Sequence, residues 1–173
     1  MLDAVAYSAV ETLRNGRRIE IRAFRSSDKA ALESAVGRAS GLTLYRRFFT
    51  IKRDFTERER EFFLNVDFID HVALVVLTEE LGQPALVGAG RYVVVKPGKA
   101  ELAFVVIDEY QGQGIGGALL RHLTILARTA GLHEFIADVL AENGPMLKVF
   151  KNCGLPMSTM RETEYVQVTL RLD

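Results

Sequence analysis

A single cysteine, Cys153, is all that this sequence offers for sulfur chemistry. One cysteine excludes an intramolecular disulfide, and without paired cysteines or a tight His/Cys cluster we expect no metal site. No apolar run reaches the roughly 18 residues that would span a bilayer, and residues 1–10 lack the basic start and apolar core of a signal peptide. We therefore expect a soluble protein with no membrane partner, suited to a reducing cytoplasm.

An excess of charge is also missing, because 22 Lys and Arg balance 22 Asp and Glu. The first sixty residues carry 13 basic and 8 acidic side chains, and this imbalance fits solvated helix faces at least as well as an anionic partner. No basic run with interleaved aromatic residues occurs, so nucleic-acid binding is not expected. With 173 residues and 49% hydrophobic positions, the chain has room for one globular domain.

The spacing of apolar residues predicts an α/β (α+β) domain over residues 17–173, preceded by an N-terminal extension, residues 1–16. One strand and three helices come first, followed by three strands in an antiparallel meander, and then helix, strand, helix and strand. This order implies a mixed, mostly antiparallel sheet with helices on both faces. The predicted strands are residues 17–24, 71–77, 85–95, 99–107, 135–140 and 164–172, and the predicted helices are residues 30–39, 42–49, 56–65, 117–131 and 145–152.

The most informative segment is the glycine-rich run Gln111-Gly112-Gln113-Gly114-Ile115-Gly116-Gly117, between a predicted strand and a predicted helix. Glycines let backbone N–H groups approach an anion, and the start of the next helix adds unpaired amides and a positive dipole end. No Gly-Lys-Ser/Thr follows, and antiparallel strands precede the run, so nucleoside-triphosphate and dinucleotide loops are disfavoured. The run predicts a diphosphate site, although a glycine-rich helix start without a ligand stays open.

Two segments resemble a known family. The run from Gln111 to Gly116 resembles the Gln/Arg-x-x-Gly-x-Gly/Ala loop of the GCN5-related N-acetyltransferases, the GNAT superfamily. Residues 143–155, Asn-Gly-Pro-Met-Leu-Lys-Val-Phe-Lys-Asn-Cys-Gly-Leu, resemble the later Asn-x-x-Ala-x-x-Leu-Tyr-x-x-x-Gly-Phe segment of that family. The element order of residues 17–172 also fits the GNAT fold. Phe150 replaces the tyrosine that protonates the leaving thiolate in many members, and Leu155 replaces a phenylalanine.

A narrower resemblance is to the acetyltransferase domain of the bacterial Pat-type protein lysine acetyltransferases. It is carried by residues 44–49 (Leu-Tyr-Arg-Arg-Phe-Phe), 100–106 (Ala-Glu-Leu-Ala-Phe-Val-Val) and 139–147 (Val-Leu-Ala-Glu-Asn-Gly-Pro-Met-Leu). Pat-type proteins often carry a further large domain, and the resemblance covers only their catalytic part. The basic and aromatic run at residues 45–49 is either a docking surface for a protein or one side of an ordinary amphipathic helix.

The resemblance implies acetyl-CoA as cosubstrate. It assigns the diphosphate to the loop amides, the pantetheine arm to the strand backbone on one side and Asn143 on the other, and the thiol end to the helix that follows. The cofactor-binding residues implied in this way are Phe104, Val105, Val106, Gln111, Gly112, Gln113, Gly114, Ile115, Gly116, Gly117, Asn143, Met146 and Phe150.

Glu101 is the candidate catalytic base. An acceptor amine with a pKa of about 10.4 must lose a proton before it can attack, so a nearby base is useful. Glu101 lies between Ala100 and Leu102 in a predicted strand, where apolar surroundings would favour proton uptake near neutral pH. It also falls where the Pat-type enzymes keep their catalytic glutamate. A solvent-facing or salt-bridged glutamate is the alternative.

Other polar residues near these segments are expected to be structural. Asp108 and Glu109 are interpreted as solvated turn residues, Glu142 as the cap of the next helix and His122 as a surface residue. Cys153 is interpreted as a small buried hydrophobe. The acceptor is either a protein with an acceptor lysine or a small-molecule amine, a homodimer is left open, and a non-catalytic acyl-CoA-binding regulatory module is the alternative from another class.

Overall fold

The computed structural model describes residues 2–48 and 56–173, with Tyr45 and Phe48 described only in their backbone. In this part of the chain the strands form one eight-stranded sheet, in the order β1-β2-β3-β4-β5-β6-β8-β7. The strands are β1 (Ser8–Thr12), β2 (Arg18–Ala23), β3 (His71–Glu80), β4 (Gln83–Lys96), β5 (Lys99–Val106), β6 (Glu134–Leu140), β7 (Met157–Arg161) and β8 (Tyr165–Arg171). The helices are α1 (Lys29–Arg38), α2 (Gly41–Phe48), α3 (Glu57–Leu64), α4 (Ile115–Thr129) and α5 (Gly144–Lys151), with short 3₁₀ turns η1 (Ala4–Ala6), η2 (Ser26–Asp28) and η3 (Asp108–Tyr110).

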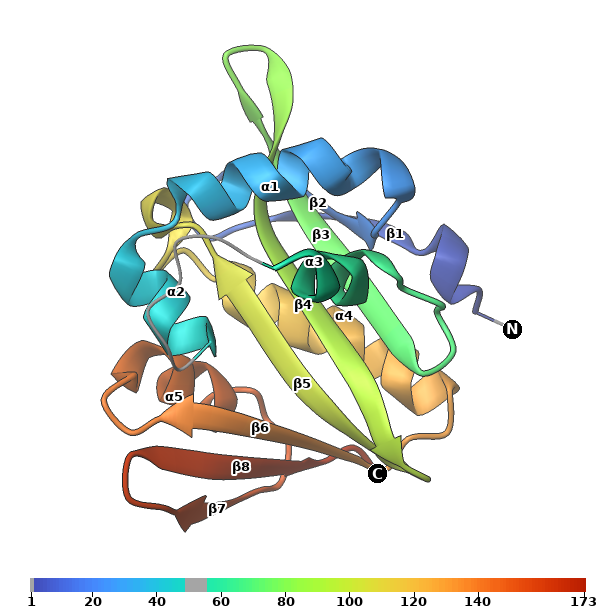
Figure 1. Cartoon of the computed structure of the whole chain (residues 1–173), viewed down its shortest axis with the longest axis vertical. Helices are drawn as coiled ribbons and strands as arrows, with labels where there is room; N and C mark the ends of the chain where they lie inside the picture. The colour runs from blue at the N-terminus through green and yellow to red at the C-terminus, as the bar shows by residue number, and fades with distance from the viewer. Residues whose placement is uncertain (1, 49–55) are drawn as a thin grey trace.

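The sheet is interrupted between β5 and β6. All other neighbouring strands run antiparallel, whereas β5 and β6 run parallel. Their pairing covers Lys99 with Glu134, Ala100 with Phe135 and Glu101 with Ile136, and no later pair forms between these two strands in the described residues. Figure 1 shows the two strands spreading apart from this junction. A wedge-shaped gap therefore opens in the middle of the sheet.

Helices cover both faces of the sheet. Figure 1 shows α1, α2 and α3 in front of the strands and α4 behind them. Strands β3 and β4 lie between these layers, and long runs of both are buried, as expected of strands covered on both faces. The mixed sheet and its two helical layers confirm the predicted fold class.

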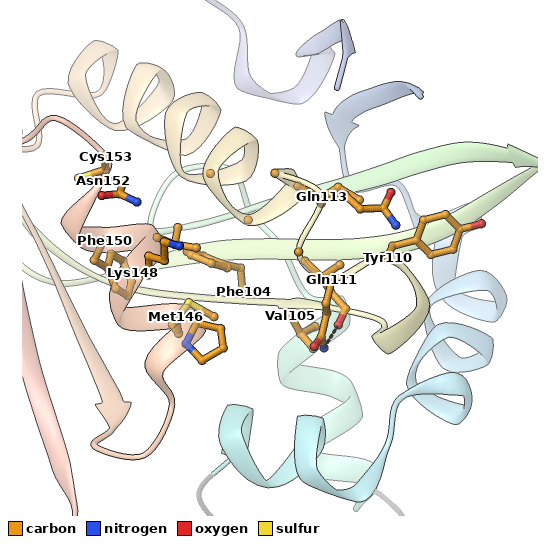
Figure 2. Close-up of a pocket in the computed structure, with 18 of the residues that line it drawn as sticks. Phe104, Val105, Tyr110, Gln111, Gln113, Met146, Lys148, Phe150, Asn152 and Cys153 are labelled. Atoms are coloured by element: carbon orange, nitrogen blue, oxygen red, sulfur yellow. Dashed lines mark hydrogen bonds between the residues drawn. The ribbon is translucent and has the colours of Figure 1, made fainter. Parts of the chain in front are cut away.

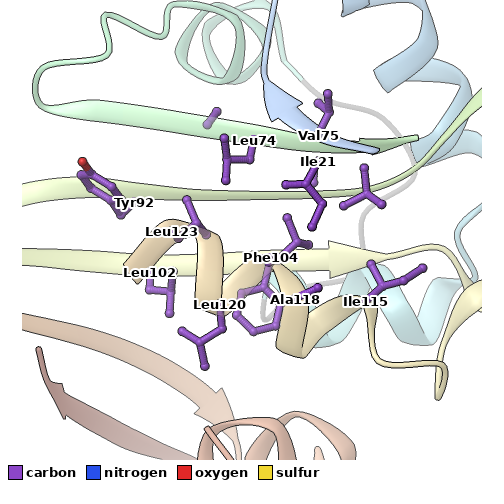
Figure 3. Packing of buried hydrophobic residues seen from close by; sticks show 14 of the residues in the cluster. Ile21, Leu74, Val75, Tyr92, Leu102, Phe104, Ile115, Ala118, Leu120 and Leu123 are labelled. Carbon is purple, nitrogen blue, oxygen red and sulfur yellow. The ribbon is translucent and has the colours of Figure 1, made fainter. Parts of the chain in front are cut away.

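The core lies between the sheet and α4. The apolar stripe of α4 includes Leu119 and Leu123, which are fully buried. Figure 3 shows Leu120 and Leu123 of α4 packed over the β5 side chains, which include Phe104. Gly90 on β4 makes this approach possible, because a Cβ there would lie 3.1 Å from the Leu123 Cδ1 atom. The periodicity seen in the sequence is therefore the core-facing stripe of this helix.

Two strands were not predicted from the sequence. Residues 8–12, within the expected N-terminal extension, form β1 and pair with β2 along their whole length. Residues 157–161 form the edge strand β7, and all five are exposed. The β3–β4 turn is also shorter than predicted, since Glu80 pairs with Gln83 across only Leu81 and Gly82. The helix predicted at residues 56–65 is α3, which begins with a capping box between Thr56 and Glu59, and Phe49, predicted to end the second helix, lies outside the described residues.

Candidate active site

The gap between β5 and β6 is the entrance to a cleft of about 1000 Å³. One wall is residues 102–106 of β5, and the opposite wall is residues 137–139 of β6. The glycine-rich loop, residues 110–117, closes one end, and α5 lines the remaining side. Figure 2 shows Phe104 in the middle, with Met146 and Phe150 of α5 on one side and Gln111 and Gln113 of the loop on the other. The cleft thus brings together the predicted cofactor-binding residues of the strand, the loop and the helix.

The loop is shaped by glycines in left-handed backbone conformations. Gly112 has φ +74° and Gly114, the N-cap residue of α4, has φ +97°, a region that side chains rarely adopt. Having no side chain, Gly114 cannot cap the helix, so the first amides of α4 are left for another acceptor. Ile115, buried in the core, anchors the first turn. Open amides at the start of a 15-residue helix suit a diphosphate.

Gly116 allows three elements to meet at the closed end of the cleft. A Cβ at this position would lie 3.4 Å from the Phe104 Cε2 atom on β5 and 3.6 Å from the Val149 Cγ2 atom on α5. The ring of Phe104 in turn lies 5.7 Å from that of Phe150. The close packing of α4 against β5 and α5 therefore favours glycine at position 116, independent of any ligand.

Side chains of the loop hold it against its neighbours. The Gln111 amide donates to the Val106 carbonyl (2.9 Å) and to Thr43 Oγ1 (3.0 Å). Gln113 Oε1 accepts from Asn15 Nδ2 (3.0 Å) and from Arg17 Nε (3.2 Å), so the β1–β2 turn braces the loop from the other side. Both glutamine side chains thus stabilise the loop conformation, and the loop backbone remains for the ligand.

Asp108 is an exposed residue of the turn η3, as interpreted from the sequence, and it also supports the start of α2. Its carboxylate accepts from the Ser40 backbone N–H (2.9 Å), the Ser40 hydroxyl (2.7 Å) and the Thr43 hydroxyl (2.9 Å) at the start of α2. Burial alone would raise the pKa of Asp108, but these hydrogen bonds hold it below its ordinary value. Glu109 is exposed as well, and its carboxylate pairs with Arg38.

Glu101 lies at the junction where β5 and β6 part. It belongs to the last residue pair of the two strands, and the next residue, Leu102, is the first on β5 to line the cleft. The expectation of apolar surroundings is wrong, because Glu101 is exposed. The Glu101 carboxylate acts on Arg47 of α2, which lines the cleft. Burial lowers the pKa of Arg47 to about 10, and the negative charge of Glu101 opposes that shift.

A buried cationic cluster beneath α3 was missed by the sequence analysis. Arg91 on β4 donates to the Phe63 carbonyl (3.2 Å), and its Nη1 atom lies 2.8 Å from Nε2 of His71 on β3. The His71 ring stacks on Phe62, with centroids 5.1 Å apart. Burial and the Arg91 charge lower the pKa of His71 to about 4, so its ring is neutral at pH 7. Burial also lowers the pKa of Arg91 to about 9, helped by the charge of Arg47.

The two residues that precede α5 have different roles. The prediction that Glu142 caps this helix is wrong, because Asn143 is the N-cap residue and its Oδ1 accepts from the Met146 N–H (3.3 Å). Glu142 instead pairs with Arg46 of α2 (3.0 Å), which joins the two sides of the cleft. Asn143 is buried and lines the cleft, so its amide nitrogen remains available to a ligand.

His122 is not a surface residue, contrary to the sequence interpretation. It is 9% exposed, its Nε2 atom lies 2.7 Å from Glu11 Oε2 on β1, and its Nδ1 atom meets the Tyr7 hydroxyl. Cys153, interpreted as buried, is partly exposed and lines the cleft. The position of His122 could not be predicted from the sequence, because both contacts join residues more than a hundred positions apart.

Residues 2–48 and 56–173 contain no group of three or more His, Cys, Asp or Glu side chains placed to hold a metal ion. None of the helices in this described part has both the length and the apolar character needed to cross a membrane.

Comparison with known proteins gives similarity to acetyltransferases. The acetyltransferase (GNAT) family model matches residues 39–155. Acetyltransferase PA5475 of Pseudomonas aeruginosa is 30% identical over 138 residues, which are 79% of this chain and 74% of that protein. Acetyltransferase Pat of Mycolicibacterium smegmatis is 38% identical over 119 residues, which are 66% of this chain and 34% of Pat, so the chain spans about a third of Pat. The crystal structure of the GNAT domain of S. lividans PAT matches with a TM-score of 0.85 at 29% identity, over 95% of this chain and 96% of that domain.

Proposed function

The chain belongs to the acetyltransferase (GNAT) family, and from that premise we propose that it transfers the acetyl group of acetyl-CoA to the ε-amine of a lysine side chain on a protein. The proposal rests on one observation: the glycine-rich start of α4 and the edge of β5 that β6 leaves unpaired line the same cleft. The first feature suits a diphosphate, and the second suits an extended ligand with its own amides. Acetyl-CoA contains both groups in this order.

The chain's own residues would hold acetyl-CoA along the cleft. The open amides at the start of α4, from Ile115 to Gly117, would bind the diphosphate. The edge of β5 that β6 leaves unpaired, residues 102–106, would pair with the pantetheine arm. Asn143 would meet the arm from the opposite side, and the apolar side chains of Met146 and Phe150 would surround the thiol end.

In the proposed reaction, the acceptor nitrogen attacks the thioester carbonyl carbon, an N–C bond forms, the C–S bond breaks, and CoA leaves as its thiolate. Glu101, at the junction where β5 and β6 part, would take the proton that the acceptor ammonium loses, directly or through water. A backbone N–H of β5 would stabilise the negative charge on the carbonyl oxygen. Because a thiol has a pKa of about 8.5, the thiolate leaves with little help, and the absence of a phenol at Phe150 is tolerated.

The choice of a protein lysine as acceptor has two supports. The first is the resemblance of residues 44–49, 100–106 and 139–147 to Pat-type enzymes. The second is the side of the cleft formed by α2, where Arg46 is held by Glu142 and the charge of Arg47 interacts with that of Glu101 on β5. Such charged side chains would meet the polar rim of a protein interface around the acceptor lysine.

The test measures CoA-thiol release with wild-type enzyme, Glu101→Gln and the matched control Glu79→Gln, an exposed glutamate near the end of the β3–β4 hairpin. We expect kcat/KM to fall at least about a hundredfold in Glu101→Gln, with acetyl-CoA affinity unchanged, and to stay at the wild-type level in Glu79→Gln. The acceptors compared are cell-extract proteins, free lysine and polyamines, with modified proteins identified by mass.

Each outcome separates one part of the proposal. Turnover with small amines alone would contradict the protein acceptor. Full activity of Glu101→Gln would remove Glu101 as the base. Tight acetyl-CoA binding without turnover on any amine would instead identify a non-catalytic acyl-CoA-binding module.

A further inference from the structure

Arg121 lies beside the glycine-rich loop, one helical turn beyond Gly117. Long side chains on a helix point back toward its N-terminus, and the Arg121 Nη1 atom lies 3.9 Å from the position that a Cβ of Gly117 would occupy. The residue lines the cleft, and its side chain is 58% exposed. A guanidinium group is therefore placed at the solvent side of the open amides.

Gly117 has no structural requirement of its own. Unlike Gly112 and Gly114, it does not have a positive φ. Unlike Gly116, it has no packed neighbour, and within 4 Å its Cβ would meet only the Arg121 guanidinium. Glycine within a helix costs about 1 kcal/mol relative to alanine. What the missing side chain does provide is an open path between the Arg121 guanidinium and the loop.

Arg121 is held in place from the side away from the loop. Its Nη2 atom donates to Glu11 Oε1 (2.6 Å), and the other oxygen of Glu11 lies 2.7 Å from His122 Nε2. The Tyr7 hydroxyl forms a hydrogen bond with the other ring nitrogen of His122, Nδ1. Within the described part of the chain, the Nη1 atom has no hydrogen-bond partner. One edge of the guanidinium is thus fixed by β1, and the other faces the ligand side.

We propose that Arg121 binds the ribose phosphate of coenzyme A, the third phosphate of that molecule, and so makes the enzyme prefer CoA to dephospho-CoA. This inference rests on the proposed function. The loop amides suffice for the diphosphate, whereas a terminal phosphate monoester carries nearly two charges at pH 7 and recruits a guanidinium. Arg14, exposed on the β1–β2 turn, also lines this end of the cleft and adds positive charge.

The experiment is titration calorimetry with CoA and with dephospho-CoA, which lacks only the ribose phosphate. We expect wild-type protein to bind CoA at least about tenfold more tightly. In Arg121→Gln the affinity for CoA falls to that for dephospho-CoA, and the affinity for dephospho-CoA is unchanged. The matched control is Lys148→Gln, a cation that lines the cleft from α5, and it keeps the wild-type ratio. Gly117→Leu, which fills the path, lowers the ratio as Arg121→Gln does.

Three results would overturn the inference: equal binding of both ligands by wild-type protein, an equal loss of both affinities in Arg121→Gln, or collapse of the ratio in Lys148→Gln instead. The second would place Arg121 on the diphosphate, and the third would place the ribose phosphate on α5. Failure of wild-type protein to bind either ligand would remove the proposed function itself, and this inference with it. Thermal unfolding of each variant checks that the fold is retained.

Discussion

The two sides of the cleft are built in different ways. The cofactor side consists of glycines, backbone amides and apolar contacts among β5, α4 and α5, all within residues 102–150. The side proposed for the acceptor has charged side chains joined across distant elements, such as Arg46 with Glu142, and the buried pair Arg91 and His71 lies beneath α3, outside the cleft lining. A cofactor that never changes can be bound by a short contiguous segment with a fixed backbone. An acceptor surface made of long-range side-chain pairs can change without disturbing that segment.

The largest expected effect is a loss of stability when apolar packing is removed from the side proposed for the cofactor. Phe104→Ala removes a buried ring that touches α4 and α5, and we expect a loss of about 3–5 kcal/mol in the free energy of unfolding. Phe62→Ala makes the same change on α3, outside the cleft lining, where the ring is 50% exposed, and should cost about 1 kcal/mol. Urea denaturation measures the free energy of unfolding of both variants, and similar losses would contradict the difference between the two regions.

The second effect is a pH dependence of stability that arises from His71, beneath α3 and outside the cleft lining. The pKa of His71 is about 4 in the folded protein, against about 6.5 in an unfolded chain. As the pH falls, His71 therefore takes up a proton in the unfolded chain before it does so in the folded protein. The contribution of His71 to the free energy of unfolding is fully present above about pH 6.5 and is lost as the pH drops toward 4. The total loss is about 3 kcal/mol.

The charged groups that act on His71 are Arg91, which lowers its pKa, and Asp67, which raises it. His71→Gln keeps an oxygen that can accept from Arg91 but does not titrate. Urea unfolding between pH 7 and pH 4 should show a flatter profile for this variant. An identical profile for the two proteins would show that the acid sensitivity arises elsewhere.

The smallest effect concerns the connection between the two sides. Asp108→Asn weakens three hydrogen bonds to the start of α2 and should cost about 1 kcal/mol of stability. Because α2 carries Arg46 and Arg47 on the acceptor side, the acceptor KM should rise a few-fold while the acetyl-CoA affinity changes less than about twofold. The control is Glu109→Gln, whose exposed side chain pairs only with Arg38 among the described residues. A larger change in acetyl-CoA affinity than in acceptor KM would contradict the division of the cleft.

The same division explains how much could be predicted from the sequence. The glycine run and the apolar stripe of α4 are local patterns, and both are found in the structure as predicted. The capping box at Thr56 and Glu59 is local as well. The five exposed residues of β7, in contrast, have no alternation to detect, and pairing with β8 alone makes them a strand. The roles of Asp108, His71 and His122 depend on partners that are distant in sequence, and no pattern along the chain indicates them.

The short β5–β6 junction has a mechanical consequence. Three residue pairs and the Lys99–Glu134 ion pair (3.5 Å) attach β6, β8 and β7 to the rest of the sheet. A small rotation at such a joint produces a larger displacement at the far ends of the strands. The contact of α4 with α5 at Gly116 and Val149 lies at that distant end and limits the rotation. The missing side chain at Gly116 therefore permits the close contact that restrains this joint.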